Sequence, residues 1–209
     1  MSISRIRPEV PLLFWVLVWA LVFGETVLAF ASWQNKDAVE WTGSETHRVL
    51  NESPWSKSAR LSYADTEVMV RWQSALPVRL ALSKAAGGRA DATNMEALNE
   101  YVIAVSGVPS RSLQMFGRDS GELLDNPTAV ENQLKRATSL LRGGHEPIYA
   151  AKVEISPAGE ERVMLFYFSK SAPIALADKE VEFRVAAART QVKRKFALRD
   201  MKYRGKLEL

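Results

Sequence analysis

The chain contains few residues of the types that carry out catalysis or hold a metal. Among its 209 residues there is no cysteine and there are only two histidines, His47 and His145. Without cysteine the chain has no disulfide, thiol nucleophile, thiolate zinc site or iron–sulfur cluster. A zinc site needs three or four converging ligands, and His47 lies only two residues after Glu45, on a different face of a helix. We therefore predict no metal site and no cofactor, with both histidines at the surface or at a helix end.

The serines do not form a recognisable nucleophile motif. None lies in a G-x-S-x-G sequence, and Ser53 and Lys57 are four residues apart, whereas S-x-x-K requires three. A catalytic triad assembled from distant residues would have to use His47 or His145 as its base. A hydrolase with an unrecognised site remains an alternative, and the sequence favours a protein that is not an enzyme.

A long polar segment, Ser106 to Asn126, offers two arginines for an anionic partner. Its glycines have the wrong spacing for a phosphate-binding loop, but long loops in folded domains are often functional. Arg111 and Arg118 are the candidate anion contacts in this segment. The structural alternative is a connector without a binding role.

The C-terminal segment is basic. Residues 189–209 contain eight lysines and arginines against two acidic residues. Lys193 and Lys195 are candidate contacts for an anionic lipid, polysaccharide or nucleic acid. They alternate with Val192 and Phe196, however, as lysines do on the solvated face of an edge strand that must not aggregate. We favour this second interpretation and expect no nucleic-acid partner, because exported proteins seldom meet nucleic acid.

The N-terminal segment resembles a secretory signal peptide. Two arginines precede an uninterrupted apolar run of 14 residues from Val10 to Phe23, whereas a membrane-spanning helix takes roughly 20. Glu25 interrupts the apolar character, and Ala29 and Ala31 form the small-x-small pattern of a cleavage site. We predict cleavage after Ala31 and a periplasmic or secreted protein. In the alternative, residues 10–31 stay as a membrane anchor and the rest of the chain lies on the non-cytoplasmic side.

The remaining residues have the composition and length of one folded domain. Hydrophobic residues make up 47% of the chain and charged residues 25%, which is ordinary for a globular protein. We predict a signal peptide or anchor at 1–31, a linker at 32–40 and a single domain at 41–209.

Helices are predicted mainly in the first half of this domain. Thr42 and Glu45 have capping-box spacing and predict a helix from about Gly43 to Asn51. Further helices are predicted after Pro77, from Thr93, and from Pro127 to Gly143, where apolar residues recur at helical spacing.

Strands are predicted mainly in the C-terminal third. Residues 68–73 and 101–106 read as strands of one sheet, and four antiparallel strands are expected after Gly144. A shift in apolar phase near Arg199 and Asp200 predicts a bulge or break. The sequence therefore predicts an α+β fold with an antiparallel sheet of about five or six strands, completed by the C-terminal third.

Three stretches, "WTGSETHRVLNESPW", "VRWQSALPVRLA" and "FALRDMKYRGKLEL", resemble a group of predicted exported bacterial proteins with no assigned function. The resemblance runs from about Trp41 to the end of the chain. It implies export and a single domain, and it brings no catalytic residue, cofactor or activity.

The sequence thus predicts an exported, non-enzymatic domain that binds an unknown protein partner or an envelope surface. One alternative is a subunit of an envelope complex, tethered to the membrane by residues 10–31. The other is the hydrolase that would use His47 or His145. Contact with a membrane is expected only if the N-terminal segment is retained.

Overall fold

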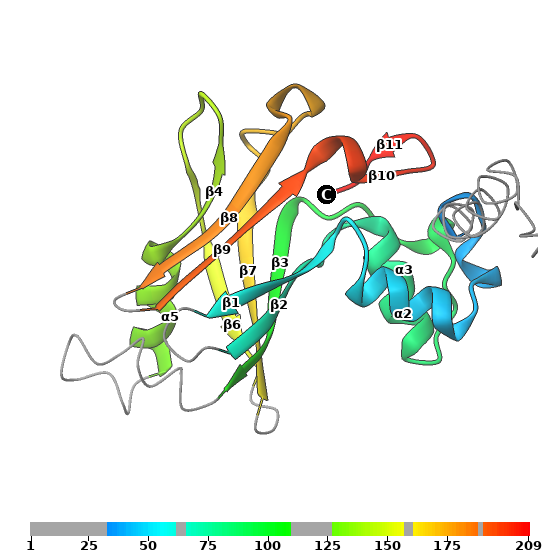
Figure 1. Ribbon diagram of the computed structural model, residues 1–209, viewed down its shortest axis with the longest axis horizontal. Coiled ribbons are helices and arrows are strands. Elements are labelled where there is room, and N and C mark those ends of the chain that lie inside the picture. Colours follow the sequence, from blue (N-terminus) through cyan, green and yellow to red (C-terminus); the bar gives the residue numbers. More distant parts are fainter. Residues whose placement is uncertain (1–32, 62–65, 110–126, 157–160, 188–189) are drawn as a thin grey trace, which may run out of the picture. The chain divides into compact units, whose positions relative to one another are not determined.

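The computed structural model (Figure 1) describes residues 33–61, 66–109, 127–156, 161–187 and 190–209. The chain divides into two units, Met1–Lys36 and Asp37–Leu209. Within the first unit the described part is a 3-10 turn, Trp33–Asn35. The predicted signal peptide or anchor lies outside the described residues. No helix in the described part of the chain is long and apolar enough to cross a bilayer.

Two helices of the second unit pack against each other: α2, Gly43–Asn51, and α3, Leu76–Ala85 (Figure 1). The capping box predicted for α2 is present. The backbone N–H of Glu45 donates to Thr42 Oγ1 at 3.1 Å, and the N–H of Thr42 donates to Glu45 Oε2 at 2.8 Å. Each side chain satisfies a backbone donor that the first helical turn leaves free.

The larger sheet, sheet A, contains five antiparallel strands in the order β1-β2-β3-β7-β6. The prediction that residues 68–73 and 101–106 share a sheet is confirmed, because Trp72 pairs with Ile103 in the β2–β3 ladder. The strands of sheet A are β1 Ser56–Leu61, β2 Thr66–Trp72, β3 Glu100–Pro109, β6 Lys152–Ile155 and β7 Glu161–Ser169.

A second antiparallel sheet, sheet B, has the order β5-β4-β8-β9. Its strands are β4 Thr138–Arg142, β5 Ile148–Tyr149, β8 Glu180–Ala187 and β9 Thr190–Ala197. A 3-10 turn, Leu198–Asp200, ends β9 and confirms the break predicted at Arg199 and Asp200. The hairpin of β10, Lys202–Tyr203, and β11, Lys206–Leu207, follows.

The core lies between the two sheets and is rich in aromatic rings. Phe183 of sheet B meets Phe166 and Phe168 of sheet A edge to face, with ring centroids 5.4 and 6.4 Å apart. Trp72 of sheet A meets Phe196 of sheet B in the same manner at 5.6 Å. All five side chains have no exposed surface. Because residues alternate along a strand, the remaining positions of each strand face away from this core.

The α+β class is confirmed, with α2, α3 and α5 (Pro127–Ala137) preceding most of the strands. The strands differ from the prediction in being divided between sheet A, sheet B and the separate β10–β11 pair. The predicted helix up to Gly143 is wrong beyond Ala137, because Thr138–Arg142 forms β4 and pairs with β8. Thr138 is fully buried, and its Oγ1 donates to the carbonyl of Leu134 at 2.6 Å, where the helix gives way to the strand.

Two further local predictions fail. The helix predicted from Thr93 is only a 3-10 turn, Ala92–Asn94, in which the Asp91 side chain accepts from the backbone N–H of Thr93. Strand β1 was not predicted, because its residues Ser56–Leu61 lack a regular apolar alternation. Its register comes from pairing with β2.

Candidate functional site

An open groove of about 480 Å³ lies between α3 and the face of sheet A that points away from the aromatic core. Its volume is in the range of small-molecule binding sites. The side chains that line it come from α3, the segment before β3, and strands β3 and β7, together with the residue after β2. They are Gln73, Arg79, Leu82, Met95, Glu96, Leu98, Val102, Leu165 and Tyr167.

The floor of the groove follows from strand alternation. In β3, Ile103 faces the aromatic core, so its neighbours Val102 and Ala104 face the other way. Across the ladder Val102 pairs with Tyr167, and Ala104 pairs with Leu165. The two-sided apolar character of β3 therefore provides a hydrophobic floor outside the core.

Two cations bind carbonyls of the segment before β3, which forms one side of the groove. Arg79 Nη1 donates to the carbonyl of Glu96 at 2.7 Å, and Lys170 Nζ donates to the carbonyl of Leu98 at 2.9 Å. The Lys170 ammonium also lies over the ring of Tyr101, 4.9 Å from its centroid. Burial lowers the pKa of Lys170, the carboxylate of Glu208 acts against this shift, and the charge of Arg79 adds to it to a smaller extent.

The C-terminal segment is tied to the beginning of α3. Burial raises the pKa of the Glu208 carboxyl, while the backbone N–H of Leu76 and the nearby cations act against that shift. The backbone carbonyl of Glu208 accepts a hydrogen bond from Trp55 Nε1 at 2.7 Å. The Glu208 carboxylate therefore accepts at the N-terminus of α3 and also interacts with the charges of Lys170, Lys206 and Arg79.

At another point of the groove, Tyr167 belongs to a polar cluster. Its hydroxyl donates to Glu154 Oε2 at 2.6 Å, and Lys152 Nζ lies 2.5 Å from Glu154 Oε1 and 5.1 Å from the Tyr167 ring centroid. Burial, followed by the hydrogen bond to Glu154, raises the pKa of Tyr167 to about 12. At neutral pH this phenol is protonated and already donating, so it is poorly suited to act as a general base.

A second hollow of about 440 Å³ lies where β2 and β3 meet, beside the irregularity of β3 between Val105 and Val108. It is lined by Ser58, Glu67, Val68, Met69, Ser106 and Gly107. Gly107 has a φ of +79°, a conformation that residues with a Cβ rarely adopt. This hollow has fewer apolar side chains than the α3 groove and contains no cation.

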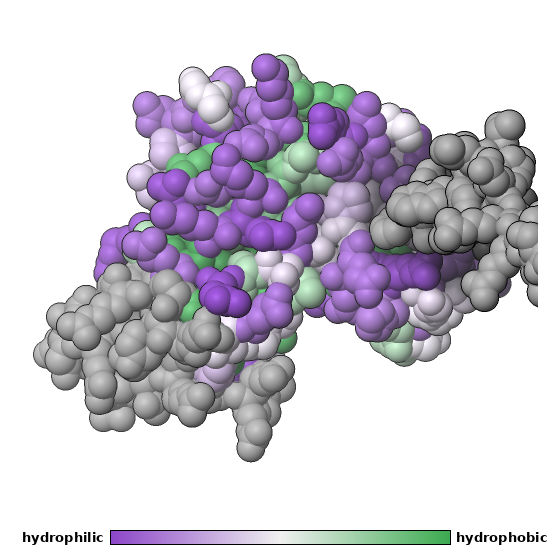
Figure 2. All heavy atoms as spheres, viewed as in Figure 1, coloured by the Kyte–Doolittle hydropathy of each residue, from purple (hydrophilic) through white to green (hydrophobic). Residues whose placement is uncertain are grey.

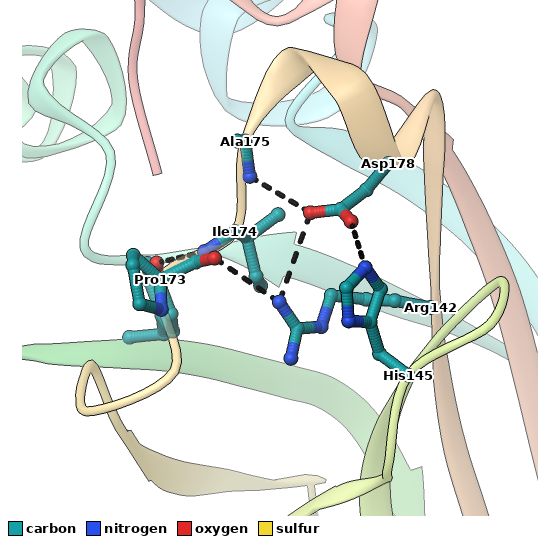
Figure 3. A network of polar contacts seen from close by, with 7 residues as sticks. Arg142, His145, Pro173, Ile174, Ala175 and Asp178 are labelled. Carbon is teal, nitrogen blue, oxygen red and sulfur yellow. Dashed lines mark hydrogen bonds and ion pairs between the residues drawn. The ribbon is translucent and has the colours of Figure 1, made fainter.

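A separate polar network surrounds Asp178 (Figure 3). His145 Nε2 lies 3.1 Å from Asp178 Oδ1, and Arg142 Nη1 lies 3.7 Å from Asp178 Oδ2. The carboxylate also accepts from the backbone N–H of Ala175 at 2.8 Å, while Arg142 donates to the carbonyl of Pro173 at 3.0 Å. Arg142 and Asp178 are buried, with side chains 6% exposed, but the His145 side chain is 53% exposed.

This network provides a histidine and a carboxylate, but not the third member of a triad. In the described part of the chain no hydroxyl group is hydrogen-bonded to His145. Over the same residues there is no group of three side chains that could hold a metal ion. His47 lies on α2, and its backbone carbonyl accepts from Asn51. The described residues therefore bring no hydroxyl nucleophile to either histidine.

Of the predicted anion contacts, Lys193 and Lys195 both lie on the outer face of β9. Lys195 Nζ is 2.6 Å from Glu180 Oε1, and its cross-strand partner is Glu182. Lys193 pairs across the ladder with Arg184. Figure 2 shows mostly hydrophilic residues over β8 and β9. Acidic and basic side chains both occur on this face, as on the solvated face of a sheet.

The other residues singled out in the sequence lie outside the described residues, namely Arg111, Arg118, Ala29 and Ala31.

Sequence reasoning missed the α3 groove. Its residues are spread over the chain from Gln73 to Tyr167, and only pairing of β3 with β7 brings Val102 and Leu165 together. The one signal in the sequence was the run "YVIAV", which is apolar on both faces and therefore needs a cover on each.

Comparison of the chain with models of known protein families, with curated proteins and with solved structures found no match. The resemblance to predicted exported bacterial proteins therefore remains a prediction.

Proposed function

We propose that this protein is a non-enzymatic binding domain and that the α3 groove is its binding surface. The observation that carries the proposal is the make-up of the groove: an apolar floor with a few converging polar groups, which is the usual composition of a ligand site. The same residues include no histidine and no serine, so the groove has the means to bind but not the usual means of hydrolysis.

The proposed place of action is the non-cytoplasmic side of a bacterial membrane. This part of the proposal rests on the N-terminal sequence, with its two arginines, its short apolar run and its small-x-small pattern. The protein acts there as a periplasmic or secreted domain. In the alternative, residues 10–31 are retained and tether it as a subunit of an envelope complex.

A hydrolase is the second candidate, and the contact between His145 and Asp178 favours it. A carboxylate that accepts from one imidazole nitrogen can orient the ring so that the other nitrogen serves as a base. The exposure of His145 leaves that nitrogen accessible. A serine-directed fluorophosphonate probe tests this candidate. If the probe labels the wild type and labelling is lost in His145→Ala, the hydrolase replaces the binding domain as the proposed function.

Site-specific photo-crosslinking in living cells tests the binding proposal. A photoreactive amino acid replaces Leu98, an exposed leucine on the rim of the groove, and in a matched variant it replaces Leu176, an exposed leucine outside it. We expect a crosslinked species from position 98 and none from position 176. The Leu98 product should vanish when Leu165→Trp fills the groove. Equal crosslinking from both positions, or none from position 98, would contradict the proposal.

A further inference from the structure

We infer that the occupant of the α3 groove is a single-chain amphipathic anion, with its acidic head at Arg79 and its aliphatic body on the floor formed by Val102 and Leu165. This inference rests on the proposed function and names the chemical class of the ligand. It follows from the charge at the rim, from the bonds that fix the cations, and from the apolar lining.

Arg79 is a fixed cation with unused donors. Its guanidinium makes one hydrogen bond, from Nη1 to the carbonyl of Glu96, out of the five that an arginine can donate. In the described part of the chain it forms no ion pair. The hydrogen bond to Glu96 orients the planar guanidinium, whose geometry suits bidentate binding of a carboxylate or phosphate.

Lys170 adds a second cation next to the groove. Its ammonium donates to the carbonyl of Leu98, a groove residue, at 2.9 Å, and it also lies 3.5 Å from an oxygen of Leu209. The two cations lie close enough for Arg79 to disfavour the charged form of Lys170. The Glu208 carboxylate outweighs this repulsion at Lys170, so we place the acidic head of the ligand at Arg79.

The acidic groups of this region are Glu208 and Glu96, and neither forms an ion pair with Arg79 in the described part of the chain. The carboxylate of Glu208 is half-buried and accepts from the N–H of Leu76 at the start of α3. Glu96 lines the groove, but it is through its backbone carbonyl that it contacts Arg79, and its side chain is exposed. Neither carboxylate makes the ion pair that would satisfy Arg79.

The rest of the lining requires an apolar body on the ligand. Beyond Arg79, Gln73 and Glu96, the groove is bounded by aliphatic side chains, methionine and the ring of Tyr167. The Tyr167 hydroxyl already donates a hydrogen bond to Glu154, so the part of Tyr167 that a ligand can contact is the apolar ring. A groove of about 480 Å³ accommodates a medium-length alkyl chain.

Methyl NMR of the full chain, purified in the N-terminal form that cells produce and labelled with ¹³C-methyl methionine, tests the inference. Met95 reports on the α3 groove, and Met69 in the second hollow is the internal control. The probes are decanoate, decyl phosphate, decanol and decyltrimethylammonium. We expect the two anions to shift Met95 and not Met69 at saturation, and the cation to leave both unchanged. Tighter binding of decanoate would indicate a fatty acid as the ligand, and tighter binding of decyl phosphate would indicate a lipid phosphate.

Variants of Arg79 separate charge from folding. Arg79→Gln should weaken decanoate binding by about 10- to 100-fold, the loss of a charge-assisted contact, while decanol binding is unchanged. Arg79→Lys should restore part of the affinity, and Arg199→Gln, at an 87% exposed side chain, should have no effect. Melting curves show which variants remain folded.

Two outcomes overturn the inference. Equal binding of decanol and decanoate, unaffected by Arg79→Gln, would show that the groove does not select an anion. No shift of Met95 with either anion would have the same consequence. In both cases a crosslink from Leu98 would leave the binding function standing, so failure of the ligand class is distinguishable from failure of the proposed function.

Discussion

Asp178→Asn should destabilise the protein much more than its position in a short 3-10 turn, Leu176–Asp178, would suggest. The substitution removes one negative charge and keeps the size of the side chain, together with an oxygen that can accept from Ala175. What it takes away is the partner of the Arg142 guanidinium, and both side chains are only 6% exposed (Figure 3). A buried cation would then remain without a counter-charge.

The magnitude follows from the separation and the burial. Two unit charges about 4 Å apart attract by about 4 kcal/mol at an effective dielectric constant near 20. Removing one partner of a buried pair typically costs about 3–5 kcal/mol because the other charge stays buried. Arg142 keeps its hydrogen bond to the carbonyl of Pro173 at 3.0 Å, which retains part of its stabilisation. We therefore expect a loss of about 3 kcal/mol.

Urea unfolding followed by tryptophan fluorescence measures this loss. His145→Ala is the matched control, since His145 contacts the same carboxylate but is 53% exposed, and it should cost less than about 1 kcal/mol. The double variant Asp178→Asn with Arg142→Met should cost less than the sum of the two single changes. A loss below about 1 kcal/mol for Asp178→Asn, or strict additivity in the cycle, would refute the reasoning.

Three further predictions concern the helix cap, the core and the Tyr167 cluster. Thr42→Ala removes the capping hydrogen bond to the Glu45 N–H and should lower the free energy of unfolding by about 1 kcal/mol in urea, with no change for the exposed Glu52→Ala. Phe183→Ala removes a fully buried ring and should cost about 3–5 kcal/mol, seen as a lower melting temperature and as weaker near-ultraviolet circular dichroism from the aromatic core. Ultraviolet titration should place the Tyr167 pKa at about 12, and Glu154→Gln should lower it. Because the pKa is raised in the folded state, the contribution of Tyr167 to stability should be complete below about pH 10 and decline toward about pH 12, and Tyr167→Phe should remove this decline.

Local features of the fold could be predicted wherever a few neighbouring residues decide the outcome. The helix from Gly43 to Asn51 was predicted to the residue because Thr42 and Glu45 form their capping box within one turn. The same locality accounts for the break at Arg199 and Asp200. Such signals need no partner from elsewhere in the chain.

Features that depend on pairing were predicted less well. Residues after Ala137 continue a helical apolar pattern, yet they form β4, because β8 supplies a partner for their backbone groups. In the same way β1 is held by its ladder with β2 rather than by its own sequence. The division of the strands into two sheets follows from which faces meet around Phe183. Local propensity is a weak determinant when a long-range ladder competes with it.

The amino-acid sequence alone determined the absence of thiol chemistry, the α+β class, the capped first helix and the expectation of export, since composition and short-range spacing are sufficient for these. The tertiary structure decided where a ligand can bind. Arg79, Leu98, Val102 and Leu165 come from a helix, the segment before a strand and two paired strands. No spacing in the sequence relates them, because a groove is formed by surfaces that meet only after the strands have paired and α3 has packed beside them.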